Sequence, residues 1–393
     1  MGLGIAGMTA AKQLAESGWA VTIVERSPAR RQGGHVVALF PTGCRSAERI
    51  GILDALPSRA GSGSSTWQVN RKGQGRPGLN LATLPGAPRM LLRSDVEKAL
   101  FNALPESMDI RFSTTPERII QFSKGAEVTL ASATDKTTTE RFDLVLGADG
   151  VRSTVRRLVF GPDANFVHNL GYMIGAAQMN TNVTSYPCSD SVMLTELGRT
   201  AMTVAYANCG PTVLFSYRTV DAQAELNKRP SEAVQAAFGP KPFGHVLNEL
   251  LEGYASAGHQ WLDIAQQVRM KQWHYGRVAL VGDAAWCMTP YTGLGASASI
   301  AGAELLVRTL TAHGDDVSSA LSDWNTRMHP FVDYQHRRIE QSRALIVAGY
   351  RKELIKQHMM IRLMSHQAAA KVIGQAMSRN TTLATKHTDL GVL

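Results

Sequence analysis

Cysteine is scarce in this 393-residue chain, which has four such residues and no CxxC pair among them. They stand far apart in the sequence, at Cys44, Cys188, Cys209 and Cys287. Because none has a partner at metal-ligand or disulfide-framework spacing, we predict no metal site and a reducing compartment. We therefore expect isolated thiols in a cytoplasmic protein.

Long apolar runs are absent as well. No stretch approaches the roughly 18 consecutive apolar residues that span a bilayer, and no basic segment followed by an apolar run marks a secretory signal. The composition, 44% hydrophobic and 19% charged, is that of a globular protein. The length suits one large two-part unit or two domains, and we expect a monomer or homodimer without a transmembrane segment.

Acidic residues are few near the end of the chain. From Arg327 onward there are eleven lysines and arginines against four acidic residues, within a net charge of +9. Apolar residues such as Phe331, Ile339 and Leu345 recur there at intervals that indicate amphipathic helices. We favour a solvated helix face over a nucleic-acid site, and attraction of anionic substrates or a partner surface is the alternative.

The chain begins with glycines at the spacing of a dinucleotide-binding turn, Gly2, Gly4 and Gly7. Residues 5–17 have helical periodicity, and residues 20–25 form a β-branched run typical of a buried parallel strand. That run ends at Glu25, 18 positions after Gly7, close to where an acidic residue meets an adenosine ribose. The segment therefore predicts a nucleotide site.

The strand that normally precedes such a turn is missing, because only Met1 stands before Gly2. In a dinucleotide-binding fold this strand has neighbours on both sides, and its loss would leave two edges without hydrogen bonds. We expect either that the chain begins several residues upstream or that another segment repairs the sheet.

Two further strands end in glycine and aspartate. Residues 117–150 alternate like a β-meander, with turns at Lys124-Gly125 and Asp135-Lys136, and end at Asp149-Gly150. Residues 277–285 form a buried strand that ends at Gly282-Asp283. Pro290, Gly293 and Gly295 follow, ahead of a helix predicted over 296–310. Such a helix N-terminus favours a nearby anion.

Other segments indicate how these signals are arranged. Ser94 and Glu97 have capping-box spacing, which predicts a helix beginning just after Arg93. Strand-like runs over 171–218 predict a separate, mostly antiparallel sheet, and helices are predicted near 221–238 and 243–255.

The ordered trio of glycine-bearing strand ends resembles the flavoprotein aromatic hydroxylases related to p-hydroxybenzoate hydroxylase, including tetracycline-inactivating and polyketide-tailoring monooxygenases. The resemblance covers residues 2–330 and implies an α/β fold. Its parts would be a Rossmann-like FAD-binding domain in two segments, an inserted antiparallel substrate domain and a C-terminal helical segment. The expected bounds are 1–165 and 271–330 for the FAD-binding domain, 166–270 for the substrate domain and 331–393 for the helical segment.

The resemblance also implies cofactor roles for the first half of the chain. Gly2, Gly4 and Gly7 would hold the FAD pyrophosphate, and Glu25, with Arg26 beside it, the adenosine ribose. Arg93 matches an arginine that contacts the ribityl-phosphate region. The family's Asp-Gly motif, implicated in binding FAD and the pyridine nucleotide, corresponds to Asp149 and Gly150.

In the second half, Asp283 matches the aspartate that binds a ribityl hydroxyl. Pro290 would lie against the flavin. The backbone N–H groups of the next turn would face the N1–C2 carbonyl edge of the ring; the turn comprises Gly293, Leu294, Gly295 and Ala296. The family commonly has histidine where this chain has Trp286, which suggests a bulkier wall.

The implied reaction begins when NADPH or NADH reduces FAD. O₂ then adds at flavin C4a, and the hydroperoxide delivers one oxygen atom to an aromatic or polycyclic small molecule. Hydroxylation, epoxidation and Baeyer–Villiger insertion remain open. The predicted sheet would cover the flavin, and for each candidate pocket residue ordinary core packing is the alternative. These candidates are Met179, Met193, Met202, Tyr206 and Phe215.

Several residues near these motifs have two interpretations. His35 is either a cofactor or substrate contact or a structural histidine. Arg30 and Arg31 either meet a 2′-phosphate of NADPH or form a solvated basic loop. Trp286 and Tyr291 lie either near the flavin ring or within packed walls. No catalytic triad or general base is predicted.

Three other functions share the expected fold. Flavin-dependent halogenases carry a WxWxIP motif, which this sequence lacks. A reductase or dehydrogenase would form product without O₂. A non-catalytic flavin-binding protein would consume no NAD(P)H with any substrate.

Overall fold

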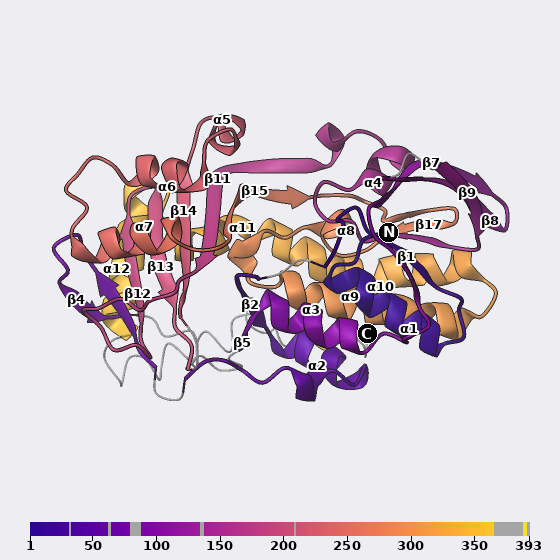
Figure 1. Ribbon diagram of the computed structural model, residues 1–393, viewed down its shortest axis with the longest axis horizontal. Coiled ribbons are helices and arrows are strands. Elements are labelled where there is room, and N and C mark those ends of the chain that lie inside the picture. Colours follow the sequence, from indigo (N-terminus) through magenta and orange to yellow (C-terminus); the bar gives the residue numbers. More distant parts are fainter. Residues whose placement is uncertain are drawn as a thin grey trace.

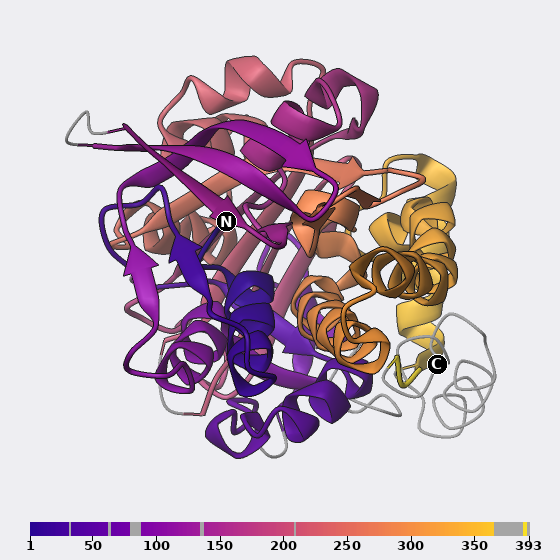
Figure 2. The ribbon, with the colours of Figure 1, turned by 90° about the vertical axis from the view of Figure 1, so that its right-hand side faces the viewer.

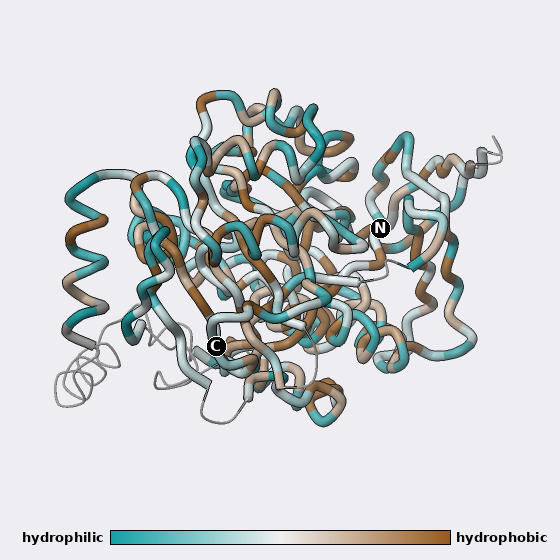
Figure 3. The backbone as a smooth tube through the Cα atoms, turned by 60° about the vertical axis from the view of Figure 1, so that its left-hand side comes forward, coloured by the Kyte–Doolittle hydropathy of each residue, from teal (hydrophilic) through white to brown (hydrophobic). Residues whose placement is uncertain are grey.

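The computed structural model describes residues 1–30, 33–61, 64–78, 88–133, 137–207, 210–364 and 388–390. A broad sheet with its helices forms one side of the molecule, and short sheets packed on long helices form the other (Figure 1). Hydrophobic residues concentrate along the inner strands and helices (Figure 3). Within the described residues, no helix is long and apolar enough to cross a membrane.

The opening glycine turn leads into a helix and a strand, as predicted. Helix α1 (Ile5–Glu16) follows Gly4, whose backbone is extended, and buries an apolar face that includes Met8 and Leu14. Strand β1 (Thr22–Val24) follows and pairs in parallel with β6 (Asp109–Arg111).

A second parallel pair, β10 (Val145–Gly147) with β17 (Val278–Leu280), lies on the other side of the chain start; β16 (His274–Tyr275) extends it. Met1 and Gly2 lie between the two pairs. The Met1 amino group donates to Leu146 O at 2.8 Å, and Met1 O accepts from Ala148 N at 2.8 Å. Gly2 N donates to Val24 O at 2.7 Å. These two residues thus bond to both neighbouring edges of the interrupted parallel sheet.

Helices cover these short strands. The long helix α9 (Gly295–His313) packs against α1, α2 (Pro41–Arg49) and α10 (Val317–Arg337), so the core lies around it (Figure 2). Strands β2 (Val36–Leu39) and β5 (Arg89–Leu92), distant in the sequence, pair antiparallel, and β5 leads directly into α3 (Arg93–Asn102). The predicted capping box of Ser94 and Glu97 is wrong. Helix α3 begins at Arg93, where the Asp95 carboxylate accepts from Leu92 N at 3.0 Å.

The predicted meander is confirmed as β7 (Thr114–Phe122), β8 (Gly125–Ser132) and β9 (Thr137–Phe142). Its turn at Lys124-Gly125 is confirmed, and the one at Asp135-Lys136 lies outside the described residues. Short helical elements η1 (Leu53–Ala55), α4 (Thr154–Val159) and η3 (Asp163–Asn165) join the larger parts.

Among the described residues, the largest sheet has the strand order β15-β11-β14-β13-β12-β3-β4. Four of its antiparallel strands correspond to the runs predicted over 171–218: β11 (Val167–Gln178), β12 (Ser191–Glu196), β13 (Arg199–Val204) and β14 (Thr212–Arg218). The edge strand β15 (Gln260–Val268), antiparallel to β11, was not among the predicted strands. In addition, β3 (Thr66–Val69) and β4 (Gly75–Pro77) join it, β3 in parallel with β12. The sheet therefore draws strands from outside residues 166–270.

Helices α6 (Pro230–Phe238) and α7 (His245–Ala255) pack on one face of this sheet, with α5 (Ala222–Leu226) nearby. On its other side lie the C-terminal helices α11 (Ile339–Ile346) and α12 (Arg351–Met364), shown in yellow tones in Figure 1. The predicted C-terminal helical segment is thus confirmed as far as residue 364.

Candidate functional site

A cavity of about 1220 Å³ lies between the short parallel strands and the β11–β15 edge of the large sheet. Ten of the predicted site residues line it: Gly2, Gly4, Glu25, Arg26, Arg93, Asp149, Gly150, Met179, Asp283 and Pro290. His35 and Arg30 also line it. The structure therefore brings the three glycine-bearing strand ends to one cavity.

The opening turn fits a bound phosphate by its shape. A Cβ added to Gly7 would stand 2.1 Å from Gly2 O, so only glycine fits there. Gly2 has a φ of 101°, and a Cβ added to it would collide with Ala148. By contrast, no described atom lies within 4 Å of a Cβ built on Gly4. The first turn of α1 has neither a side-chain cap nor an acidic residue from the described chain. Its N–H groups and positive dipole end thus suit an anion.

Glu25 is fixed beside this turn at the end of β1. Its carboxylate accepts from Leu3 N at 2.8 Å and from Ser27 N at 2.9 Å. These bonds place an acceptor group next to the Gly4 opening, where a ribose hydroxyl would require one.

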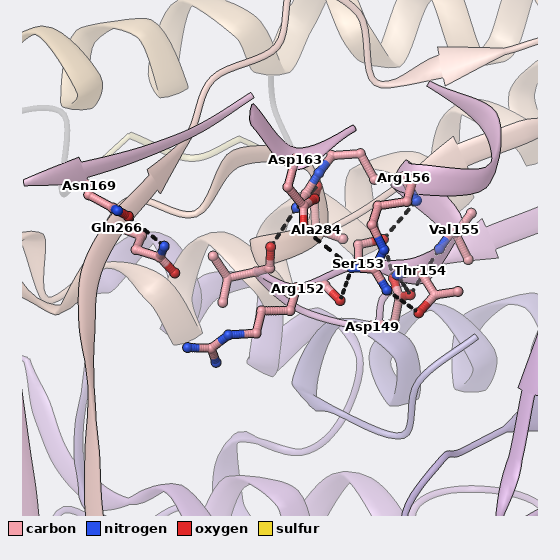
Figure 4. Close-up of polar contacts among 12 residues, drawn as sticks. Asp149, Arg152, Ser153, Thr154, Val155, Arg156, Asp163, Asn169, Gln266 and Ala284 are labelled. Atoms are coloured by element: carbon pink, nitrogen blue, oxygen red, sulfur yellow. Dashed lines mark hydrogen bonds and ion pairs between the residues drawn. The ribbon is translucent and has the colours of Figure 1, made fainter. Parts of the chain in front are cut away.

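Asp149 anchors the loop after β10. Its carboxylate accepts from the Ser153 hydroxyl at 2.5 Å and from the N–H groups of Thr154 and Val155 at 2.6 and 3.1 Å (Figure 4). Gly150 has a φ of 81° and open space where a side chain would stand. The aspartate therefore shapes the loop, and the glycine leaves room for a ligand.

Sequence reasoning missed Arg156, which joins two of the motifs. This fully buried side chain donates to Val151 O at 2.6 Å, to Ala284 O at 2.8 Å and to Asp163 at 2.6 Å (Figure 4). The spacing from Ser153 to Arg156 matches an N-cap. No sequence signal indicates the link to Ala284, beside Asp283.

Asp283 lines the cavity, and its side chain is exposed there although protein surrounds it. Burial raises its pKa, and the positive charge of Arg93 acts in the opposite direction. The Arg93 Nε donates to Glu97 at 2.8 Å, which holds the guanidinium at the cavity wall.

His35 and Trp261 stack where the two sides of the cavity meet. Their ring centroids are 4.6 Å apart, and the planes differ by 21°. Burial, together with the charges of Arg93 and His259, lowers the pKa of His35 to about 4. His35 is therefore neutral near pH 7 and adds no charge to the cavity. Trp261, on β15, was not among the predicted residues.

Arg152 and Asp263 form an ion pair between the β10–α4 loop and β15. The guanidinium contacts both carboxylate oxygens, at 3.0 and 2.5 Å. Both residues line the cavity, so this pair links its two sides.

Within the described chain, the turn that begins at Pro290 reaches the cavity only at its first residue. Pro290 belongs to η4 (Pro290–Thr292) and lines the cavity. The described residues that line the cavity do not include the rest of the predicted turn: Gly293, Leu294, Gly295 and Ala296. Gly293 is left-handed, with a φ of 67°. Helix α9 starts here without a side-chain cap or acidic first turn from the described residues.

The predicted substrate residues separate into two groups. Met193 and Met202 are cross-strand partners, half-buried, on the face opposite the one that packs on α6 and α7. Neither is among the described residues that line the cavity. Phe215 packs on the helix side, with ring centroids 5.5 Å from Phe238 and 5.4 Å from Tyr254. Core packing therefore accounts for Phe215.

Met179 is buried in the same helix-side core and also reaches the cavity. Tyr206 is buried, with its hydroxyl 2.9 Å from that of Thr212, and is not among the described wall residues.

The sequence left two interpretations open for Trp286, Arg30 and Arg31. Trp286 is buried in a cluster with Trp273 and Trp324, so the wall-packing interpretation applies to it. The guanidinium of Arg30 stands over the Phe101 ring at 4.0 Å. Arg31 lies outside the described residues.

These features define a two-part dinucleotide-binding flavoprotein fold. A family model described as "FAD binding domain" matches residues 1–333. An uncharacterized protein of Mycobacterium tuberculosis is 32% identical over 346 residues, covering 84% of this chain and 89% of that protein. A flavin-dependent monooxygenase from an unknown prokaryotic organism is 25% identical over 341 residues, covering 85% of each.

Among solved structures, tetracycline destructase Tet(51) superposes with a TM-score of 0.76 at 24% identity, covering 98% of this chain and 95% of that one. The chain belongs to the FAD-binding-domain family of flavin-dependent monooxygenases. This assignment confirms the predicted family resemblance, the fold class and FAD as cofactor.

Proposed function

We propose that this enzyme uses NADPH or NADH and O₂ to insert one oxygen atom into an aromatic or polycyclic small molecule. The observation that carries the proposal is the cavity itself. One wall presents three glycine-bearing strand ends, and the other presents Trp261 and an antiparallel sheet.

The residues on the first wall fit FAD. Gly4 and the N-terminus of α1 would receive the pyrophosphate, and Glu25 the adenosine ribose. Asp283 and Arg93 would contact the ribityl chain, and Pro290 the ring. When bound, FAD supplies the redox chemistry: it accepts electrons from the nicotinamide and activates O₂.

The chain's own residues orient the reactants and limit access of water. Arg156 and Asp149 fix the loop that faces the cofactor. The neutral His35, stacked on Trp261, offers an aromatic surface and an uncharged polar group at the junction of the walls. Met193 and Met202 occupy the face of the sheet opposite the helices, outside the described cavity wall, and would contact the part of an apolar substrate that extends beyond it.

The first test is the visible absorption spectrum of the purified protein, with mass identification of any released chromophore. Bound FAD is the expected result, followed by NAD(P)H oxidation stimulated by aromatic compounds and by incorporation of isotopically labelled O₂ into product. Product without label from O₂ would favour a reductase. Absence of NAD(P)H consumption across the compounds would favour a non-catalytic flavin protein.

We further propose a cytoplasmic monomer or homodimer. The described cysteines Cys44, Cys188 and Cys287 are free thiols, which supports a reducing compartment. Light scattering of the full chain would measure its oligomeric state.

A further inference from the structure

The turn containing Pro290 is tied to the middle of the large sheet by a buried hydrogen bond. The hydroxyl oxygens of Tyr291, in η4, and Ser216, in β14, are 2.7 Å apart, and either can donate. Tyr291 is 7% exposed and Ser216 5% exposed. A side chain adjacent to the predicted flavin contact thus bonds directly to the sheet on the other side of the molecule.

The backbone at this point is strained. Thr289, which is buried, has a φ of 61°, an uncommon value for a β-branched residue. Its hydroxyl accepts from Tyr291 N at 3.1 Å. Such conformations persist when surrounding contacts fix them, and they concentrate at functional sites. The bond from Tyr291 to Ser216 is therefore well placed to maintain the conformation next to Pro290.

The C-terminal segment packs against the element that contains Tyr291. Helix α11 packs against η4, and the ring of Tyr172 meets that of Tyr291 edge-on, with centroids 6.2 Å apart. The buried guanidinium of Arg343 lies 5.2 Å from the Tyr172 ring centroid and donates to Glu353 at 2.8 Å. The segment also bonds to the sheet through Thr200, whose hydroxyl donates to Ile346 O at 2.8 Å.

We propose that Tyr291 is a positioning residue, which holds the Pro290 turn against the flavin through its hydrogen bond to Ser216. The C-terminal residues around Arg343 support it in this role. The inference rests on the proposed placement of the flavin beside Pro290. It assigns to the sheet and the C-terminal segment a part in setting the cofactor's environment, in addition to forming the substrate wall.

The test compares the FAD-loaded full chain with Tyr291→Phe, which removes the hydroxyl and keeps the ring. We expect FAD to bind about three- to tenfold more weakly, as for loss of one buried hydrogen bond, and the visible bands of the bound flavin to shift. Ser216→Ala should produce the same band shift. The double variant should add little, because both changes remove one interaction.

Tyr217→Phe is the matched control. Tyr217 neighbours Ser216 on β14 but points to the opposite face, where its buried hydroxyl donates to Glu225 at 3.0 Å. We expect this variant to lose stability without changing FAD affinity or the flavin bands.

The outcomes separate the inference from the proposed function. If the wild type binds FAD and Tyr291→Phe matches Tyr217→Phe in affinity and spectrum, the positioning role is wrong and the proposed function stands. If the wild type does not bind FAD, both are wrong. If Tyr291→Phe and Ser216→Ala shift the bands independently and additively, the bond between them is not the cause and the inference fails.

Discussion

The cavity wall built by the short parallel strands and their turns and the wall built by the large sheet present different chemistry to a ligand. The first presents backbone turns and helix ends around Gly4 and Gly150, with side chains such as Asp149 used to fix the loops. The second presents side chains, among them Trp261 and Asp263. A wall made of backbone turns depends on local sequence, whereas a wall of strand side chains depends on which face each strand turns inward.

This difference gives different expectations for substitutions. Changes at the turns should alter FAD binding whatever the substrate. Changes on the sheet should alter either stability or substrate choice, according to the face they occupy.

The largest expected effect separates the two faces of the sheet. Phe215→Ala should lower the free energy of unfolding by about 4 kcal/mol, because it empties a site between Phe238 and Tyr254. Met202→Ala, on the opposite face, should cost about 1 kcal/mol or less and instead change which aromatic compounds stimulate NAD(P)H oxidation. Chemical denaturation and a substrate panel measure the two. Equal destabilisation by both would contradict the assignment of faces.

The next effect tests the glycine turn. Gly7→Ala should destabilise the fold by about 3 kcal/mol and abolish FAD binding, because its Cβ would overlap Gly2 O. At Gly4 the backbone is extended and there is open space for a Cβ. The Gly4→Ala variant should therefore fold with wild-type stability and still lose FAD affinity. Thermal unfolding and FAD titration distinguish these cases. Full FAD affinity in Gly4→Ala would show that the turn does not hold the cofactor.

The junction of the two walls should be sensitive to pH. The unfolded pKa of His35 is near 6.5 and the folded pKa about 4, so between these values the unfolded state binds a proton that the folded state does not. The contribution of His35 to stability is therefore complete above pH 6.5 and falls as the pH drops toward 4. At pH 4 the loss should be about 2 kcal/mol, since the cavity admits some water.

His35→Gln removes this titration and should flatten the decline in the free energy of unfolding between pH 6.5 and 4. Denaturation curves at several pH values, compared with the wild type, measure the difference. Parallel pH profiles for the two proteins would place His35 in a solvated site.

The smallest effect concerns the ion pair across the cavity. Arg152 is 49% exposed and Asp263 is 18% exposed, so their coupling should contribute about 0.5 kcal/mol and weaken with salt. A double-mutant cycle of Arg152→Ala and Asp263→Asn measures it. A coupling above about 2 kcal/mol would indicate that the two walls are joined chiefly by this pair.

Local signals in the sequence determined much of the wall that contains the glycine turns. Gly2, Gly4 and Gly7 identify a turn because close approach and open space there depend on the absent side chains themselves. The meeting of the strand ends at Asp149 and Asp283 was predictable, because neighbouring parallel strands have their carboxyl ends at the same edge of a sheet. The opening helix, the meander and the C-terminal helices followed from periodicity for the same reason: each pattern is short-range.

Tertiary structure alone decided the rest. Alternation in β14 shows that Ser216 and Phe215 face opposite sides, but only the packing of α6 and α7 decides which side is the core. The stack of His35 on Trp261, the reach of Arg156 to Ala284 and the bond from Tyr291 to Ser216 join residues distant in the sequence. The sequence by itself determined the glycine turns that the cavity wall contains, because their geometry is set by the backbone within a few residues. Which side chains meet them was decided only when the sheet, the short strands and the C-terminal segment packed together.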